Sequence, residues 1–150
     1  MLSKFYSQAT LQLDTKNRVR IPPLFKRAFE DLQEIYIFQD INDSLALMTE
    51  LSFEAFATKF DNIPECDVEL QNAKESIFSN VKIVPIDNQM RFVIPQELME
   101  ISGLTRGVVF KGAGDRLRLY PEEGEVGKDV GKKGSVNRAY GKINGSEYKF

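Results

Sequence analysis

Histidine and tryptophan are absent from this chain of 150 residues, and cysteine occurs once, as Cys66. A single cysteine excludes an internal disulfide and a thiolate cluster, and the lack of histidine removes the commonest metal ligand and the commonest general base. Cys66 has no histidine partner to activate it as a nucleophile, so we interpret it as a small, partly buried apolar residue. The composition therefore predicts a protein that is not an enzyme and that binds no metal or cofactor.

Long apolar runs are also missing. No stretch approaches the roughly 18 residues that a membrane span needs, and residues 1–5 lack the basic and apolar regions of a signal peptide. We therefore expect a cytoplasmic protein with no membrane partner. The net charge of −2 argues weakly against nucleic acid as a partner, because most nucleic-acid-binding domains are basic. One stretch, from Thr15 to Phe29, has no acidic residue and carries five cations: Lys16, Arg18, Arg20, Lys26 and Arg27.

The main feature of the sequence is an internal duplication. The nine residues DTKNRVRIP at 14–22 return 73 positions later as DNQMRFVIP at 87–95. The apolar segments that follow also correspond, 35–37 with 108–110 and, at an offset of 72, 45–48 with 117–120. Such a repeat constrains the architecture before any propensity argument, because two similar halves should fold alike.

Each half is predicted to fold as strand, strand, helix, strand, strand. In the first half, alternating apolar residues predict strands over 8–13 and 18–21, the second of which places Arg18 and Arg20 on one strand face. Pro22 and Pro23 open a helix, and further strands follow at 35–38 and 45–48. The apolar residues of the predicted helix recur at helical spacing: Leu24, Phe25, Ala28, Phe29 and Leu32.

An unrepeated segment separates the halves. Its pattern predicts two helices, with Thr49 and Asp67 as their N-caps. The aromatic stripe of Phe53, Phe56 and Phe60 is interpreted as core, packed within the domain or across a subunit contact.

The second half repeats the pattern, with strands over 81–86 and 91–94 and a helix that ends near Gly103. Pro85 cannot donate to a ladder, so its strand should lie at an edge or contain a bulge. We predict a single domain over residues 1–123, made of repeat one (about 6–49), a helical insert (about 50–80) and repeat two (about 81–123). Residues 124–150 are rich in glycine and lysine and are predicted to form a flexible tail.

The first copy of the motif is the better candidate for a phosphate contact. Lys16 lies in its turn, and Arg18 and Arg20 share a strand face, whereas the second copy keeps only Arg91 as a cation. Arginine offers forked donors to phosphate or guanine, and a two-stranded ribbon can enter the major groove. The alternative, that these are ordinary solvated charges of an amphipathic strand, has equal support from the composition.

The repeated motif, the helix after each copy and the segment 103–120 resemble the MraZ family of bacterial transcriptional regulators. The resemblance covers about residues 6–123. It implies an α+β fold of two tandem swapped-hairpin (AbrB-like) halves that form a double-split β-barrel, and assembly into a homo-oligomeric ring, typically an octamer. It further implies a nucleoid-associated regulator that binds short direct repeats upstream of the operon for cell division and wall synthesis.

The resemblance also assigns residues. The family's DNA-contacting residues correspond here to Lys16 and Arg18, and Arg91 matches the arginine of the second motif. Arg20 is our addition from the strand alternation. The aspartates of the two motifs, Asp14 and Asp87, are interpreted as structural acceptors of backbone hydrogen bonds in the turns.

The two turns depart from the family at one position, where Asn17 and Met90 replace the usual glycine. Asparagine adopts a left-handed conformation at little cost, but methionine there would cost roughly 1 kcal/mol or more. The second turn should therefore either differ in conformation or be strained.

A second function is compatible with the sequence, namely a ring-forming protein-interaction scaffold with weak or no specific DNA binding. Its docking surface would be the apolar helical insert. Salt dependence separates the two functions, because apolar contacts with a protein are much less salt-sensitive than contacts with phosphate.

Overall fold

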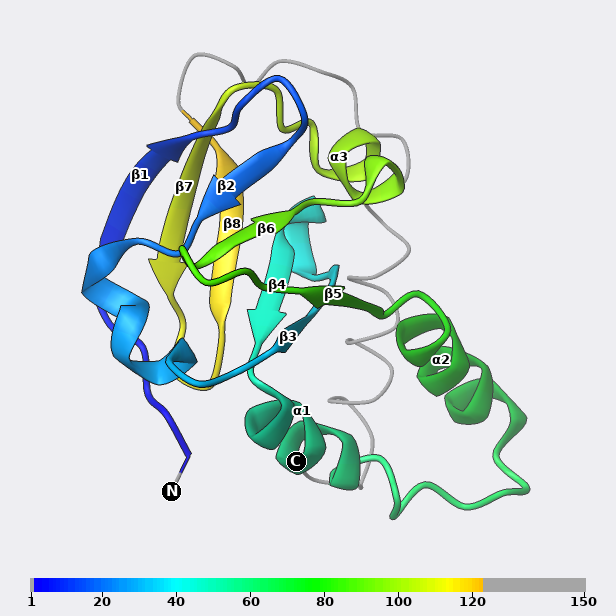
Figure 1. The fold of residues 1–150 in the computed structure, drawn as a ribbon. Helices are drawn as coiled ribbons and strands as arrows, with labels where there is room; N and C mark the ends of the chain where they lie inside the picture. The colour runs from blue at the N-terminus through cyan, green and yellow to red at the C-terminus, as the bar shows by residue number, and fades with distance from the viewer. Residues whose placement is uncertain (1, 123–150) are drawn as a thin grey trace.

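The computed structural model describes residues 2–122, and Figure 1 shows their elements. The first half contains β1 (Gln8–Gln12), β2 (Arg18–Arg20), the 3-10 helix η1 (Pro23–Phe29), β3 (Glu34–Gln39), the short 3-10 segment η2 (Ile41–Asp43) and β4 (Leu45–Met48). The helices α1 (Glu50–Thr58) and α2 (Val68–Phe78) follow, and then β5 (Lys82–Pro85), β6 (Arg91–Val93), α3 (Gln96–Ser102), β7 (Gly107–Gly112) and β8 (Leu117–Pro121). The predicted α+β class is confirmed.

The two halves exchange strands in a six-stranded antiparallel sheet of order β1-β7-β8-β4-β3-β5. The first strand of each half pairs with the third strand of the other, β1 with β7 and β5 with β3. The registers of these pairs are equivalent, since Gln12 faces Gly107 in one and Pro85 faces Glu34 in the other. Within residues 2–122 the sheet keeps two edges, β1 and β5, and no closed barrel is formed.

A second, two-stranded sheet pairs β2 with β6, and we call it the ribbon. Val19 faces Phe92 at its centre, with Arg18 opposite Val93 on one side and Arg20 opposite Arg91 on the other. In Figure 1 the ribbon crosses in front of the main sheet. It therefore brings the two copies of the motif together.

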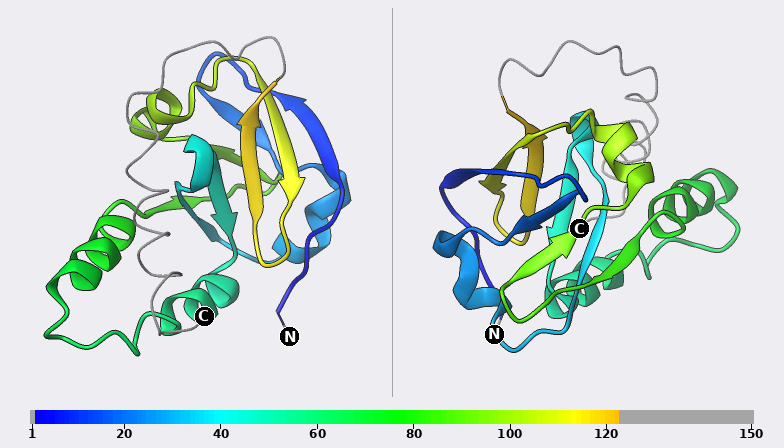
Figure 2. Two further views of the ribbon diagram at one scale, coloured as in Figure 1. Left: turned by 180° about the vertical axis from the view of Figure 1, so that it is seen from behind. Right: turned by 45° about the horizontal axis from the view of Figure 1, so that its top comes forward.

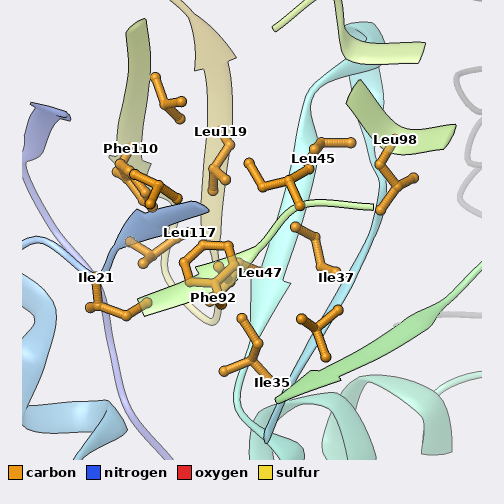
Figure 3. Close-up of a cluster of buried hydrophobic side chains, with 14 of the residues drawn as sticks. Ile21, Ile35, Ile37, Leu45, Leu47, Phe92, Leu98, Phe110, Leu117 and Leu119 are labelled. Atoms are coloured by element: carbon orange, nitrogen blue, oxygen red, sulfur yellow. The ribbon is translucent and has the colours of Figure 1, made fainter. Parts of the chain in front are cut away.

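The inner face of the ribbon is apolar and packs on the main sheet. Val19 and Phe92 are buried, as are Ile21 and Ile94 just beyond the strands. Figure 3 shows Ile21 and Phe92 among side chains that come from both halves. Burying a side chain of this size contributes roughly 1.5–3 kcal/mol. This packing fixes the ribbon to the sheet and leaves its outer face to solvent.

The helical insert covers the opposite side of the β3–β4 hairpin. Along β3, Ile35 and Ile37 enter the core under the ribbon, whereas Phe38 packs with Phe56 and Phe60 of the insert in a second apolar cluster. The interpretation of the aromatic stripe as core is therefore confirmed, and the packing is within the domain. Figures 1 and 2 show α1 and α2 at one end of the molecule, away from β2.

Local signals in the sequence placed several boundaries correctly. Thr49 Oγ1 accepts a hydrogen bond from Ser52 N at 3.1 Å, and Asp67 Oδ1 accepts one from Leu70 N at 3.1 Å, so both predicted caps are confirmed. Gly103 follows α3 with φ of 74°, the left-handed conformation that ends many helices. Pro85 lies in the edge strand β5, as its missing N–H requires.

Two expectations were wrong. The segment after Pro22 is a 3-10 helix, and Leu24 is 58% exposed instead of facing the core. Because a 3-10 helix has three residues per turn, Phe25 and Ala28 fall on one side and Leu24 is left outside. Cys66 is exposed, since it lies in the loop between α1 and α2. The predicted tail and the domain limit at 123 lie outside the described residues.

Candidate nucleic-acid interface

The first motif folds as a turn that is held by the carboxylate of Asp14. Its Oδ1 accepts hydrogen bonds from Lys16 N at 2.8 Å and Arg18 N at 2.9 Å, and its Oδ2 accepts one from Arg18 Nε at 2.7 Å. These bonds, above all the backbone bond from Arg18 and then its side-chain bond, lower the pKa of Asp14 to about 2. The aspartate therefore fixes both the backbone of the turn and the plane of the Arg18 guanidinium.

The second motif repeats this arrangement. Asp87 Oδ1 accepts from Gln89 N at 2.9 Å and Arg91 N at 2.8 Å, and Oδ2 accepts from Arg91 Nε at 2.9 Å. The backbone bond from Arg91 is the main cause of the lowered pKa of Asp87. The fourth residue of each turn is left-handed, with φ of 61° at Asn17 and 64° at Met90. Of the two alternatives, the second turn thus keeps the conformation and carries the strain.

The two turns lie at opposite ends of the ribbon. Ile94 N donates to Asn17 O at 2.9 Å at one end, and Ile21 N donates to Met90 O at 2.8 Å at the other. Asn17 also donates from Nδ2 to Gln96 Oε1 at 3.2 Å. Each turn is therefore anchored to the half that it does not belong to.

The outer face of the ribbon carries Arg18, Arg20, Arg91 and Val93. Residues directly opposite in an antiparallel pair point to the same face, so Arg20 and Arg91 lie side by side. Arg18 and Arg91 are ion-paired with the aspartates of their own turns, but Arg20 forms no ion pair with any residue in 2–122. Like charges directly opposite each other cost roughly 0.2–1 kcal/mol, so this face is not optimised for stability.

The structure therefore brings together three of the four predicted contact residues. Arg18, Arg20 and Arg91 line one surface depression of about 350 Å³ together with Gln12 and Asp14. Lys16 is exposed in the first turn, beyond the end of that depression.

Sequence reasoning missed a group of polar residues at the second turn. Asn88 and Gln89 line a second depression, of about 520 Å³, with Arg20 and Lys26 of the first half. Lys26 belongs to the basic stretch that composition revealed, but its position beside the second turn follows only from the pairing of β2 with β6.

Within residues 2–122, no helix is long and apolar enough to cross a membrane. The same part of the chain contains no group of three or more His, Cys, Asp or Glu side chains placed to hold a metal ion.

Comparisons with known proteins point to one family. A family model described as "MraZ protein, putative antitoxin-like" matches residues 77–124, which include β5 to β8. A "Transcriptional regulator MraZ" of Mesomycoplasma hyopneumoniae (strain 7448) is 27% identical over 111 residues, which are 74% of this chain and 75% of the relative. Proteins of the same name from Mycoplasmopsis synoviae (strain 53) and Mycoplasmoides gallisepticum are 28% identical over 144 residues and 29% identical over 108. These matches cover 90% and 72% of this chain and 97% and 75% of the relatives.

These relatives are named as transcriptional regulators. Their names describe regulation and state no catalytic activity. The family model and the relatives confirm the resemblance to the MraZ family that the repeated motif predicts.

Proposed function

We propose that the protein is a sequence-specific transcriptional regulator that contacts DNA through the outer face of the ribbon. The observation that carries the proposal is the pair Arg20 and Arg91, an exposed and a half-buried cation that lie opposite each other across the ribbon. Among the described residues only Arg91 has an acidic partner, Asp87. A protein gains nothing in stability from such a pair. A polyanion that lies over the ribbon neutralises both charges and gains from counterion release.

The ion pairs to the turn aspartates prepare Arg18 and Arg91 for recognition. Each guanidinium is held through Nε, which leaves its terminal Nη groups to donate outward. That pair of donors matches the O6 and N7 acceptors of guanine and also the oxygens of a phosphate. Lys16, in the exposed first turn, adds a point charge at one end of the ribbon.

One ribbon is a small interface, and several must act together for tight binding. We propose that the chain assembles into a homo-oligomeric ring, with an octamer as the expected size, whose ribbons bind short direct repeats upstream of the operon for cell division and wall synthesis. Linked sites bind far more tightly than one site alone, which offsets the negative net charge of the chain. The resemblance to the MraZ family supports this assembly and these targets.

The test is fluorescence anisotropy with the DNA immediately upstream of this protein's own operon and a scrambled duplex, at about 50 and about 200 mM salt. Arg20→Ala is the most informative variant because Arg20 has no ion pair to lose, and Arg18→Ala tests the motif arginine. Lys59→Ala, which removes an exposed cation next to α1, is the matched control. We expect tighter binding to the upstream duplex, a decrease with salt, and large losses for both arginine variants but not for the control.

Equal binding of both duplexes by folded, oligomeric protein would refute the proposed function as a sequence-specific regulator. The scaffold would then be the better hypothesis, although the structure weakens the case for the helical insert as its docking surface. The aromatic side chains of the insert pack in the second apolar cluster, with Phe56 and Phe60 buried and Phe53 stacked on Tyr36 at 4.8 Å between ring centroids.

A further inference from the structure

We propose that the second turn reads an adenine edge through Asn88 and Gln89, while Arg20 and Lys26 hold the adjacent phosphates. This inference rests on the proposed DNA-binding function and assigns separate roles to residues at one end of the ribbon. It makes the two ends chemically different, although their backbones are equivalent.

The geometry places these side chains at one site. Asn88, Gln89, Arg20 and Lys26 line the same depression of about 520 Å³, and Pro23 and Met90 also line it. The hydrogen bond from Ile21 N to Met90 O, at 2.8 Å, ties the turn to the strand that carries Arg20. Residues that lie far apart in the sequence therefore form a single surface beside the outer face of the ribbon.

The turn is fixed, but its two amide side chains are available. The bonds of Asp87 to Gln89 N and Arg91 N hold the backbone. The side chains of Asn88 and Gln89 are exposed, and neither makes a hydrogen bond to another residue of 2–122. A rigid backbone that presents unoccupied donors and acceptors reduces the ordering cost of binding.

Charge also favours contact at this end. The second motif has Gln89 where the first has Lys16, and it appears poor in cations when read alone. Arg20 and Lys26 of the first half supply that charge in the folded protein, and neither is ion-paired within the described residues. Glu30 and Asp31 lie on the same depression. They repel phosphate, so the DNA backbone should follow the side that carries Arg20 and Lys26.

The chemistry of the two turns then predicts different bases. A side-chain amide can donate from its NH₂ group to adenine N7 while its oxygen accepts from the adenine N6 amino group. Asn and Gln therefore recognise adenine in the major groove. Lysine, which has donors only, favours guanine O6 and N7 or a phosphate. The ribbon should therefore recognise an asymmetric element, with an A·T pair at the end where Gln89 lies.

The experiment is selection of bound duplexes from a library with a randomised core, using the full-length oligomeric protein. The variants are Gln89→Ala, Asn88→Ala, Gln89→Lys and Lys26→Ala. Asn62→Ala, which removes an exposed amide between α1 and α2, is the control. Wild-type protein should select an adenine at one fixed position of the motif. Gln89→Ala should relax that position alone, by about tenfold, and Gln89→Lys should shift it towards guanine.

Lys26→Ala should instead weaken all sequences equally and lower the slope of log K against log salt by about 1. If Gln89→Ala and Asn88→Ala both keep the wild-type base preference while Arg20→Ala and Arg18→Ala lose binding, the inference is overturned and the proposed function stands. If wild-type protein selects no motif at all, the proposed function fails and the inference fails with it.

Discussion

Asp40 links the β3–β4 hairpin to the β7–β8 hairpin through its contacts with Arg116 and Arg118. Its replacement by asparagine should destabilise the fold by about 3 kcal/mol. The carboxylate is fully buried at the start of the β3–β4 turn. Its Oδ1 accepts from Ile41 N at 2.8 Å, and its Oδ2 accepts from Arg116 Nη1 at 3.2 Å and Arg118 Nε at 2.9 Å. Asparagine preserves the shape but removes the charge that compensates two guanidinium groups.

The magnitude follows from the burial of the partners. Removing one partner of a buried ion pair typically costs about 3–5 kcal/mol, because a charge remains buried without compensation. Arg118 is 26% exposed, so water can compensate part of its charge, and Arg116 keeps an ion pair with Asp115 at 2.9 Å. Both facts place the cost at the lower end of the range, about 3 kcal/mol.

Urea unfolding measures this cost, at a fixed protein concentration because the stability of the proposed oligomer would depend on concentration. With a slope of about 1–3 kcal/mol per M, a cost of about 3 kcal/mol should lower the midpoint by roughly 1–3 M with the slope unchanged. Asp115→Asn is the matched control, since it removes a partly exposed partner of the same Arg116 and should cost about 1 kcal/mol or less. A midpoint for Asp40→Asn no lower than that of the control would refute the reasoning.

Three further predictions concern the motif itself. Met90→Asn should raise the melting temperature by relieving up to about 1 kcal/mol of left-handed strain. Met90→Ala keeps the strain and should lower the melting temperature. Equal melting temperatures for the two variants would contradict this. The pKa of Asp14 is about 2 in the folded protein against 3.8 in the unfolded chain, so this residue contributes stability that is full above pH 4 and is lost as the pH falls towards 2. Acid titration of Asp14→Asn should therefore show a smaller loss of stability than titration of the wild type. Val93→Arg should strengthen binding to scrambled DNA and steepen its salt dependence by about 1, and an unchanged slope would place Val93 away from the phosphates.

The element order was predictable because local signals and the repeat agreed. Strand alternation around Val19, the caps at Thr49 and Asp67, and the proline at 85 each act over a few residues, so a sequence displays them directly. The repeat added the equivalence of the halves. The 3-10 geometry that exposes Leu24 was not visible, because helical spacing of apolar residues does not distinguish a 3-10 helix from an α-helix over so short a segment.

The candidate site was predictable only within each motif. The pairing of Asp14 with Arg18 spans four residues, and the sequence indicated Arg18 as a DNA contact and Asp14 as a structural acceptor in the turn. The position of Arg20 opposite Arg91 depends on the register between β2 and β6, and nothing local sets that register. The sequence alone could not decide between a changed and a strained second turn, because tertiary contacts at Met90 override the intrinsic preference of methionine.

Strand exchange explains why counting cations motif by motif underestimates the second copy. Each turn is anchored on the other half, Asn17 O to Ile94 N and Met90 O to Ile21 N, so each end of the ribbon is built from both repeats. In the depression beside the second turn, the cations Arg20 and Lys26 therefore come from the first repeat and the amides from the second. A duplicated fold in which each half kept its own strands would present two separate, unequal motifs. Exchange produces instead one continuous face whose two ends have the same backbone conformation and differ in chemistry, which suits the proposed recognition of a directional DNA element.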